Sequence, residues 1–324
     1  MEFEQPDRLP MVEWATYWNQ TVDRWLTEGL PERYAEAHAL RDYVGLDCWR
    51  QHWARPRGGD CPRPVSHGAG ILRTQEEYET LLPHLYPGPE AMLRAIEPWA
   101  EAHARGDMVA WLTVEGFFWY PRTLFGIESH LYAFYDEPDL MHRMNRDLLE
   151  WNLRTIDRFC TVTTPDFVTI AEDMSYNHGP MVSKELFDEF MAPYYRELVG
   201  ALETRGVIPI VDSDGDVTEL VPWLEAVGVR GILPLERMAG VDVAAVRRNH
   251  PRFLMIGAYD KTVMHRGEAA MRQEFERLVP TMRTGGFIPS VDHQTPPDVS
   301  WQTYHVYLRL LAEYAEKGAP RSSR

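Results

Sequence analysis

The chain has 324 residues, of which 44% are hydrophobic and 25% charged, and its formal net charge is −16. This usage is typical of a globular protein, and the length suits one large domain or two small ones. The acidic balance argues against nucleic acid and anionic membranes as partners, because both carry negative charge. No signal peptide or membrane span is expected from the sequence. The three cysteines are far apart and form no C-x-x-C pair, so a cytoplasmic location is expected.

The first hundred residues show no clear alternation of strands and helices, and the Pro/Gly/Arg-rich stretch over 52–70 is predicted to be a loop. The first clear strand covers 108–114. A long helical stretch over 130–159 follows it and is expected to break near Pro138. The next strand covers 166–171, and the helix after that strand should begin at Ser183, whose hydroxyl is a suitable N-cap.

Four shorter strand–helix units complete the chain, with strands over 207–211, 231–235, 253–257 and 286–291. These strands are apolar throughout, which is typical of a parallel sheet covered on both faces. Six units would allow an open doubly wound sheet, and two more in the first hundred residues would close a barrel. No glycine-rich nucleotide-binding motif follows any strand, which favours the barrel. We predict one (β/α)8 TIM-barrel domain over 1–324, with an irregular N-terminal segment over 1–100.

Acidic side chains follow almost every predicted strand. Because the carboxyl ends of parallel strands share one face of a barrel, these side chains should meet at the site. The aromatic run over 117–120 could line this site or belong to the core. The residues that we predict to act in catalysis are Glu172, Asp173, Glu236 and His293, and those predicted to bind the substrate are Glu115, Phe117, Trp119, Tyr176, His178 and Tyr259.

Two aspartates, Asp212 and Asp214, follow strand 207–211 at a spacing of two, which places both on one side of an extended chain. Converging carboxylates repel each other and raise each other's pKa. Such a group is acceptable if it binds a cation, shares protons for acid–base chemistry, or is dispersed into helix caps and ion pairs. Asp216 stands three residues before Glu219, which is a capping-box spacing for a helix starting at 217.

Three segments resemble the uroporphyrinogen decarboxylase superfamily in its bacterial decarboxylase-like branch. They are "DFVTIAEDMSYNHGPMVSKELFDEFMAPYYREL", "VDSDGDVTELVPWLEAVGVRGILPLERMAGVDV" and "GAYDKTVMHRGEAAMRQEFERLVPTMRTGGFIPSVDHQTPPDVSWQTY". The resemblance covers roughly residues 107–316. It implies a (β/α)8 barrel with its site at the carboxyl ends of the strands, and a homodimer.

Two chemistries occur in that superfamily. Its true decarboxylases use no cofactor and hold a tetrapyrrole with an arginine-containing segment, of which "WRQHWARP" with Arg50 and Arg55 is a partial likeness. Its corrinoid-linked methyltransferases hold zinc through a His-x-Cys pair and a further Cys. Those positions correspond here to Asp212, Asp214 and Asp292. The change to oxygen ligands implies a harder ion such as Mg, Mn or Fe, or a less tightly held zinc.

We therefore expect an enzyme that transfers a methyl group to or from a small molecule, with a divalent metal at Asp212, Asp214 and Asp292. The resemblance also implies a corrinoid protein as a partner. One alternative is a cofactor-free decarboxylase of a small or tetrapyrrole carboxylic acid, in which a strand-end aspartate or His293 protonates the carbon. The other alternative is a non-catalytic binding protein on the same fold.

Overall fold

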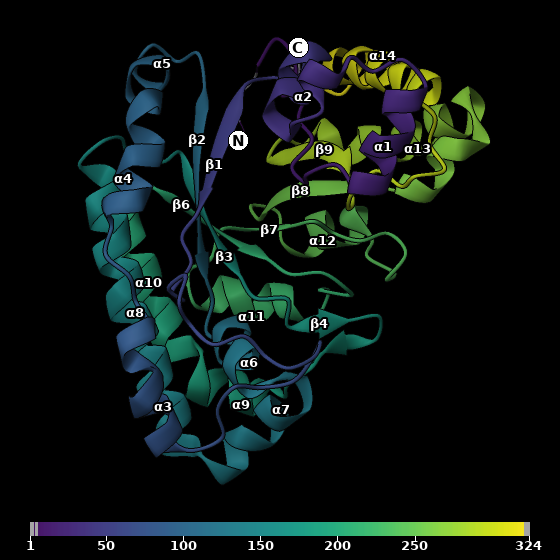
Figure 1. Cartoon of the computed structure of the whole chain (residues 1–324). Coiled ribbons are helices and arrows are strands. Elements are labelled where there is room, and N and C mark those ends of the chain that lie inside the picture. The colour runs from purple at the N-terminus through teal and green to yellow at the C-terminus, as the bar shows by residue number, and fades with distance from the viewer. Residues whose placement is uncertain (1–2, 4–5, 321–324) are drawn as a thin grey trace.

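A single curled parallel sheet organises the computed structural model, which describes residues 3 and 6–320. Seven strands of this described part form the sheet in the order β1-β2-β3-β6-β7-β8-β9 (Figure 1). A separate small hairpin, β4 and β5, follows β3. The strands are β1 (Trp49–Trp53), β2 (Val109–Glu115), β3 (Phe167–Ala171), β4 (Ser175–Tyr176), β5 (Gly179–Pro180), β6 (Ile208–Asp212), β7 (Gly231–Leu233), β8 (Leu254–Tyr259) and β9 (Phe287–Val291).

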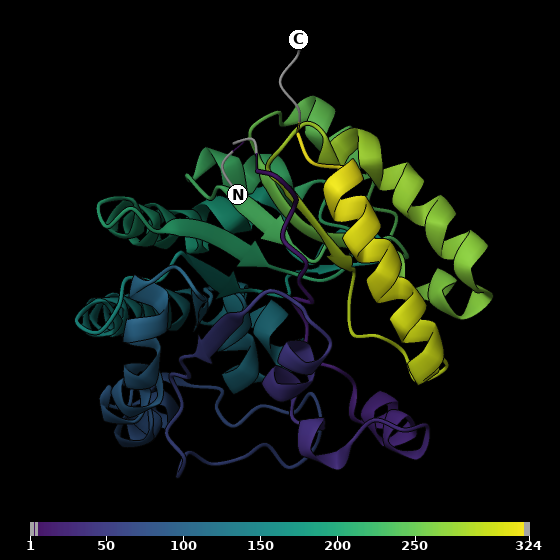
Figure 2. The ribbon, with the colours of Figure 1, turned by 90° about the horizontal axis from the view of Figure 1, so that it is seen from above.

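Helices surround the curled sheet on its outer face, and side chains of the strands fill its inner face. In Figure 1, α3, α4, α8 and α10 lie on one side and α13 and α14 on the other, and Figure 2 shows the yellow α14 beside the green α13. The helices are α1 (Asn19–Thr27), α2 (Ala37–Tyr43), α3 (Gln75–Leu81), α4 (Glu90–Ile96), α5 (Ala100–Ala104), α6 (Trp119–Phe125), α7 (Ile127–Asp136), α8 (Pro138–Cys160), α9 (Lys184–Phe190), α10 (Ala192–Glu203), α11 (Leu220–Ala226), α12 (Val243–Asn249), α13 (Glu268–Met282) and α14 (Trp301–Lys317). No helix of the described residues has both the length and the apolar character needed to cross a membrane.

Two predicted helix boundaries are confirmed and one is corrected. The long helical stretch breaks at Pro138, which opens α8 because proline has no N–H to lose in a first turn. Ser183 caps α9 by accepting a hydrogen bond from the backbone N–H of Leu186 at 3.3 Å. The helix predicted from 217 begins three residues later, since Asp216 accepts from the Thr218 N–H at 3.0 Å and caps a turn instead.

The N-terminal hundred residues supply one strand of the sheet, β1, rather than the two that the barrel prediction required. The segment before α1 lies between the two edge strands. The Trp14 indole N–H donates to the Val291 carbonyl of β9 at 2.7 Å. At the other edge, the Asp47 N–H, close to the start of β1, donates to the Met11 carbonyl at 2.9 Å. The purple trace in Figure 2 follows this path.

The interior of the curled sheet is filled by large side chains near the amino ends of the strands. This inner cluster consists of Trp49, Trp111, Phe167, Ile210, Leu233, Ile256 and Ile288. Polar side chains lie one step further toward the carboxyl ends, where the Thr113 and Thr169 hydroxyls are 2.7 Å apart. The Gln51 amide donates to Thr113 at 2.7 Å. A packed apolar floor with polar groups above it therefore separates the carboxyl face from the amino face.

Candidate functional site

A cavity of about 340 Å³ lies at the carboxyl ends of the strands. It is the place where a parallel barrel puts its site, because the loops that follow the strands converge there. No lysine or arginine is among the residues of the described chain that line this cavity, which we call the barrel cavity. They are Trp14, Ala15, Thr16, Gln51, Trp53, Trp111, Trp119, Ala171, Glu172, Asp173, Asp212, Asp214, His293 and Gln294.

Asp212 is the last residue of β6, and its neighbour on β3 is Ala171. Within the described chain, no N–H or O–H group donates a hydrogen bond to its carboxylate, which faces the barrel cavity. Burial raises the pKa of Asp212 to about 8, and the charges of Asp214 and Asp173 add to that effect, whereas His293 opposes it. Asp212 is thus a partly buried acid without an ion-pair partner in the described chain.

Asp173 lies directly after β3 and Glu172, with its backbone in the left-handed region at φ 44°. The Arg122 guanidinium of α6 holds it in place, donating to the Asp173 carboxylate and to its carbonyl, both at 3.1 Å. Burial raises the pKa of Asp173 to about 6; the charge of Asp214 adds to this and Arg122 counteracts it. Asp173 therefore lines the barrel cavity with its carboxylate paired to Arg122.

His293 and Asp214 form the acid–base pair of the cavity. The His293 Nε2 atom is 3.7 Å from the Asp214 Oδ2 atom. The interaction with Asp214 raises the pKa of His293, although burial opposes this. The His293 ring also meets the edge of Trp14, with 6.2 Å between centroids. Two of the residues predicted from strand ends therefore form an ion pair when His293 is protonated.

The turn that presents Asp214 depends on Gly215. Its φ of 84° lies in the region that favours glycine, and a Cβ there would be 2.7 Å from the Tyr176 backbone nitrogen. The Gly215 N–H donates to the Glu236 carboxylate at 3.0 Å. Glu236 also lies 3.5 Å from the Lys261 ammonium. Glu236, predicted to be catalytic, thus supports the Asp214 turn from outside the cavity lining.

Glu172 touches the cavity but is used to hold helix α6. Its carboxylate accepts hydrogen bonds from the N–H groups of Phe117, Phe118 and Trp119 at 2.9, 2.8 and 3.1 Å, and from the Tyr195 hydroxyl. Burial raises its pKa to about 7, and these four hydrogen bonds oppose that rise. With all four donors directed at its two oxygens, this predicted catalytic residue acts as a scaffold that positions Trp119.

The three predicted metal ligands are not brought together. Asp292 is fully buried, and its oxygens accept from the Arg237 N–H at 3.0 Å and the Lys261 N–H at 3.2 Å. The Lys261 ammonium lies 3.5 Å from the same carboxylate. Across residues 3 and 6–320, no group of three or more His, Cys, Asp and Glu side chains could hold a metal ion. The set of Asp212, Asp214 and Asp292 does not fit a metal, because the Asp292 carboxylate already accepts two backbone hydrogen bonds and lies beside the Lys261 ammonium.

Residues of the aromatic run over 117–120 lie in two different environments. Trp119 lines the cavity, as predicted for the substrate site. Phe117 belongs to the core, where it packs on Tyr194 and Tyr195 at 5.6 and 5.3 Å between centroids. Tyr259, also predicted to bind substrate, is fully buried outside the cavity lining. It packs on Phe275 and Tyr307 of α13 and α14 at 4.5 and 5.1 Å.

The remaining substrate-site candidates lie outside the cavity lining. Tyr176 and His178 are on the β4–β5 hairpin, where their exposed rings contact each other edge to face at 5.6 Å. Glu115 is buried at the end of β2, 3.7 Å from the Arg55 guanidinium of the loop after β1. Burial raises its pKa to about 7. Tyr176 and His178 follow β3 and Glu115 ends β2, yet none of the three lines the barrel cavity.

Sequence reasoning missed the side chains that form most of the cavity wall. Trp14 comes from the segment before α1, and Trp53 and Gln51 come from β1, which was taken for irregular chain and loop. Trp111 points inward from β2 and donates to the Thr169 hydroxyl at 2.7 Å. The alternation of Gln51 and Trp53 along one strand was the available signal, since alternate residues face one side of a sheet.

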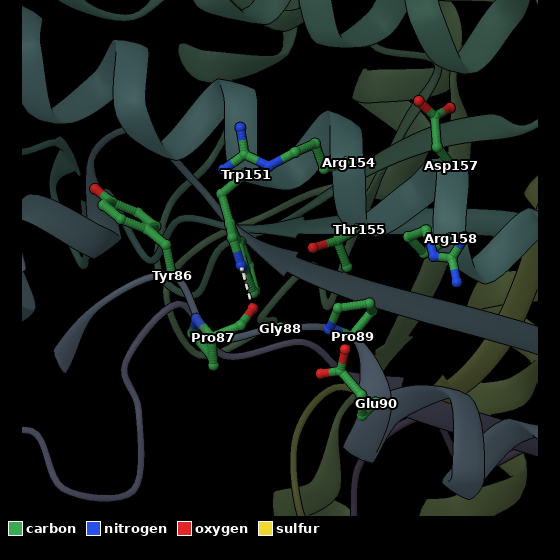
Figure 3. A pocket seen from close by; sticks show the side chains of 10 residues that line it. All are labelled: Tyr86, Pro87, Gly88, Pro89, Glu90, Trp151, Arg154, Thr155, Asp157 and Arg158. Carbon is green, nitrogen blue, oxygen red and sulfur yellow. Dashed lines mark hydrogen bonds between the residues drawn. The ribbon is translucent and has the colours of Figure 1, made fainter. Parts of the chain in front are cut away.

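A second cavity, of about 510 Å³, lies between α8 and the segment over 86–90 (Figure 3). Trp151 crosses it and donates its indole N–H to the Pro87 carbonyl at 2.9 Å. Its α8 residues lie in the half of that helix that leads toward the start of β3, near the amino ends of the strands. Because barrel sites occur at the opposite face, we assign the site to the barrel cavity instead.

A family model identifies the family of this chain, and a solved structure shares its fold. The family described as uroporphyrinogen decarboxylase (URO-D) matches residues 122–314. A methyltransferase from Methanosarcina mazei is similar in structure over 96% of this chain and 95% of that one, with 13% identity and a TM-score of 0.66. A putative vitamin-B12 independent methionine synthase from Listeria monocytogenes matches over 93% and 94%, with 11% identity and a TM-score of 0.46. No curated protein matches the sequence.

The predicted (β/α)8 barrel class is thereby confirmed, since the family and the methyltransferase have a TIM-barrel fold. In this chain the barrel is built from seven hydrogen-bonded strands within the described residues, and the N-terminal segment lies between the two edges. At 13% identity the structural similarity establishes the fold alone. The family match covers more than half of the sequence and includes Asp173, Asp212, Asp214 and His293. The chain belongs to the uroporphyrinogen decarboxylase (URO-D) family.

Proposed function

We propose that this protein transfers a methyl group to or from a small molecule bound in the barrel cavity. The observation that carries the proposal is the lining of that cavity, which has three aspartates and a histidine but no lysine or arginine. Such a lining repels the carboxylates of a tetrapyrrole, whereas a methylated small molecule needs no anion-binding group. A volume of about 340 Å³ is at the small end for ligand sites, which also favours a small molecule.

In this proposal, His293 transfers the proton that accompanies methyl transfer, and Asp214 stabilises the protonated form of His293. When the methyl carbon leaves a heteroatom for a nucleophilic acceptor, that heteroatom gains an electron pair, and protonated His293 donates a proton to it. In the opposite direction, neutral His293 removes a proton from the heteroatom that receives the methyl group. Asp214 stabilises the protonated ring through its 3.7 Å contact and so adjusts the His293 pKa upward.

The acceptor of the methyl group and the oligomeric state of the protein remain predictions. A corrinoid partner protein is implied by the sequence resemblance, and a homodimer is expected on the same ground. A divalent metal (Zn, Mn, Fe or Mg) is also a prediction, but the position of Asp292 does not suit it and we assign no step to it. Metal analysis of protein purified without chelator tests this directly.

One observation favours a second candidate, the cofactor-free decarboxylation of a small monocarboxylic acid. Asp212 has no ion-pair partner, and its pKa is raised to about 8, so it would hold a proton at neutral pH. A protonated acid in a buried site can protonate the carbon that loses carbon dioxide. This candidate predicts carbon dioxide release that persists in chelator.

Incubation with ¹³C-methyl donors that carry the methyl group on oxygen, sulfur or nitrogen, in the presence of a reduced corrinoid, tests methyl transfer. NMR should show loss of the donor methyl signal with the wild-type chain. His293→Ala should slow that loss on the order of 10²-fold, the scale of one general acid. Glu219→Gln, an exposed substitution on the same segment as Asp214, is the matched control. Full activity in His293→Ala would contradict the proton-transfer role, and carbon dioxide release without methyl transfer would favour the second candidate.

A further inference from the structure

We propose that the barrel cavity recognises an organic cation, namely a protonated amine or quaternary ammonium group of the substrate. Asp212 would supply the counter-charge and the tryptophans Trp14, Trp53, Trp111 and Trp119 the aromatic walls. The inference deepens the proposed function, because the molecule bound in this way would be the methyl donor or acceptor. It concerns recognition of the charge and does not depend on which atom carries the methyl group.

The charges around the cavity leave an excess of negative charge. Arg122 offsets Asp173 through its contact at 3.1 Å, and His293 offsets Asp214 when it is protonated. Asp212 has neither an ion pair nor a hydrogen bond to its carboxylate within the described chain. It is therefore the acid in the cavity that is left for a ligand. A cation bound beside it would favour the ionised carboxylate, so Asp212 would lose its proton as the ligand binds.

The groups behind the cavity do not reverse this balance. Arg55, which lies over Trp53, is 3.7 Å from the Glu115 carboxylate. Lys261, which acts on His293, is shared between two carboxylates, Glu236 and Asp292, each at 3.5 Å. Because one ammonium faces two carboxylates, the cluster of Lys261, Glu236 and Asp292 also carries a net negative charge. Because opposite charges attract strongly in a partly buried site, a cationic ligand would gain energy here and an anionic one would be repelled.

Four indole rings line the same cavity, which is a second and independent indication of a cation. The faces of aromatic rings carry negative charge and attract ammonium groups, and tryptophan does so most strongly. Two of these rings already bind cations of the protein, since the Arg55 guanidinium lies 4.7 Å from the Trp53 centroid and Arg122 lies 5.1 Å from that of Trp119. A lining of carboxylates and indoles suits a positively charged group that carries alkyl substituents.

The spacing of the acids favours an organic cation over a metal ion. A metal needs several ligands within about 2.0–2.6 Å of one point. Within the part of the chain that the structure describes, no three acidic, histidine or cysteine side chains are placed that way. An ammonium group with methyl substituents is larger and has no fixed coordination number, so it can be held by one carboxylate and ring faces.

Choline and its neutral isostere 3,3-dimethylbutan-1-ol form a matched pair of probes that differ in the charged nitrogen. Tryptophan fluorescence and calorimetry on the full chain should show choline or tetramethylammonium binding on the order of tenfold more tightly than the neutral alcohol. Asp212→Asn should remove this preference and leave the weak binding of the alcohol unchanged. Trp119→Leu should weaken binding of the cations, and Glu219→Gln should have no effect.

Equal affinity for choline and the alcohol, full choline affinity in Asp212→Asn, or no binding of either cation would overturn the inference. Circular dichroism of each variant separates loss of binding from loss of folding, and Asp212→Glu, which keeps the charge, should retain the preference for the cation. Selective binding of the cations without any methyl transfer would refute the proposed reaction and leave the recognition standing. Methyl transfer from a neutral donor, with no binding of ammonium probes, would refute the recognition of a cation and leave the proposed reaction standing.

Discussion

The Asp214 carboxylate and the His293 ring are 3.7 Å apart, although the two residues are separated by 79 positions in the chain. Asp214 follows strand β6 and His293 follows strand β9. Three other carboxylates, those of Asp212, Asp173 and Glu236, lie around this pair and act on its protonation or on each other's. The pair is held by the Gly215 turn on one side and by the edge of Trp14 on the other. Its chemistry can therefore be tested without knowing the substrate.

Asp214→Asn should lower the pKa of His293, because the interaction with the Asp214 carboxylate is the largest cause of its raised value. The proton would then leave the ring at a lower pH. An NMR titration of the His293 ring resonances measures this directly. Asp216→Asn serves as the control, since the Asp216 carboxylate accepts a hydrogen bond from the Thr218 N–H and is not paired with His293. A His293 titration that is unchanged in Asp214→Asn would refute the pairing.

Glu115 should make the folded state less stable as pH rises. Burial raises its pKa from 4.5 to about 7, so the folded state binds the proton more tightly than the unfolded state does. Its contribution is fully present below the unfolded pKa and is lost as pH rises through the folded one. Glu115→Gln cannot ionise, so it should be more stable than wild type by about 1–3 kcal/mol at alkaline pH and nearly equal to it in acid.

Denaturant unfolding of wild type and Glu115→Gln at two pH values, one below 4.5 and one above 7, gives the comparison. Glu219→Gln, which removes an exposed carboxylate, should show no difference between the two conditions. A stability gain of Glu115→Gln that is the same in acid and in alkali would contradict the raised pKa.

Glu172→Gln should destabilise the fold by about 2 kcal/mol, because an amide NH₂ would face N–H donors that now point at a carboxylate oxygen. Tyr195→Phe removes one donor of the same set and should cost less, about 1 kcal/mol. Thermal or chemical unfolding measures both. Since Glu172 also positions Trp119, its substitution should change the tryptophan fluorescence. The reverse order of the two losses would contradict the scaffold role.

Gly116→Ala should destabilise the protein by about 2–4 kcal/mol. A Cβ at this position would lie 2.2 Å from the Glu172 carboxyl carbon, which its hydrogen bonds hold in place. Gly200→Ala is a matched control in helix α10, where a Cβ meets no atom within 4 Å. That substitution should stabilise by about 0.5–1 kcal/mol, because alanine favours helix. Equal effects of the two substitutions would show that Glu172 moves freely.

The sequence by itself determined the family, the barrel class and six of the seven strands in the described sheet, because runs of buried apolar residues and helix caps such as Ser183 are local signals. It also placed Asp173, Asp212, Asp214 and His293 at the carboxyl face, since the end of a strand is visible in sequence. Trp119 was identified for the same reason. Each of these positions follows from the period of a single element.

Only the tertiary structure decided which strand-end side chains share the cavity. Asp292 follows β9 as Asp212 ends β6, yet two N–H groups from distant loops donate hydrogen bonds to the Asp292 carboxylate and hold it away from the predicted metal set. Tyr259 and Phe117 pack into the core between helices, and Trp14 enters from the opposite end of the chain. Hydrogen-bond partners and packing neighbours come from residues far apart in sequence, so no local pattern records them.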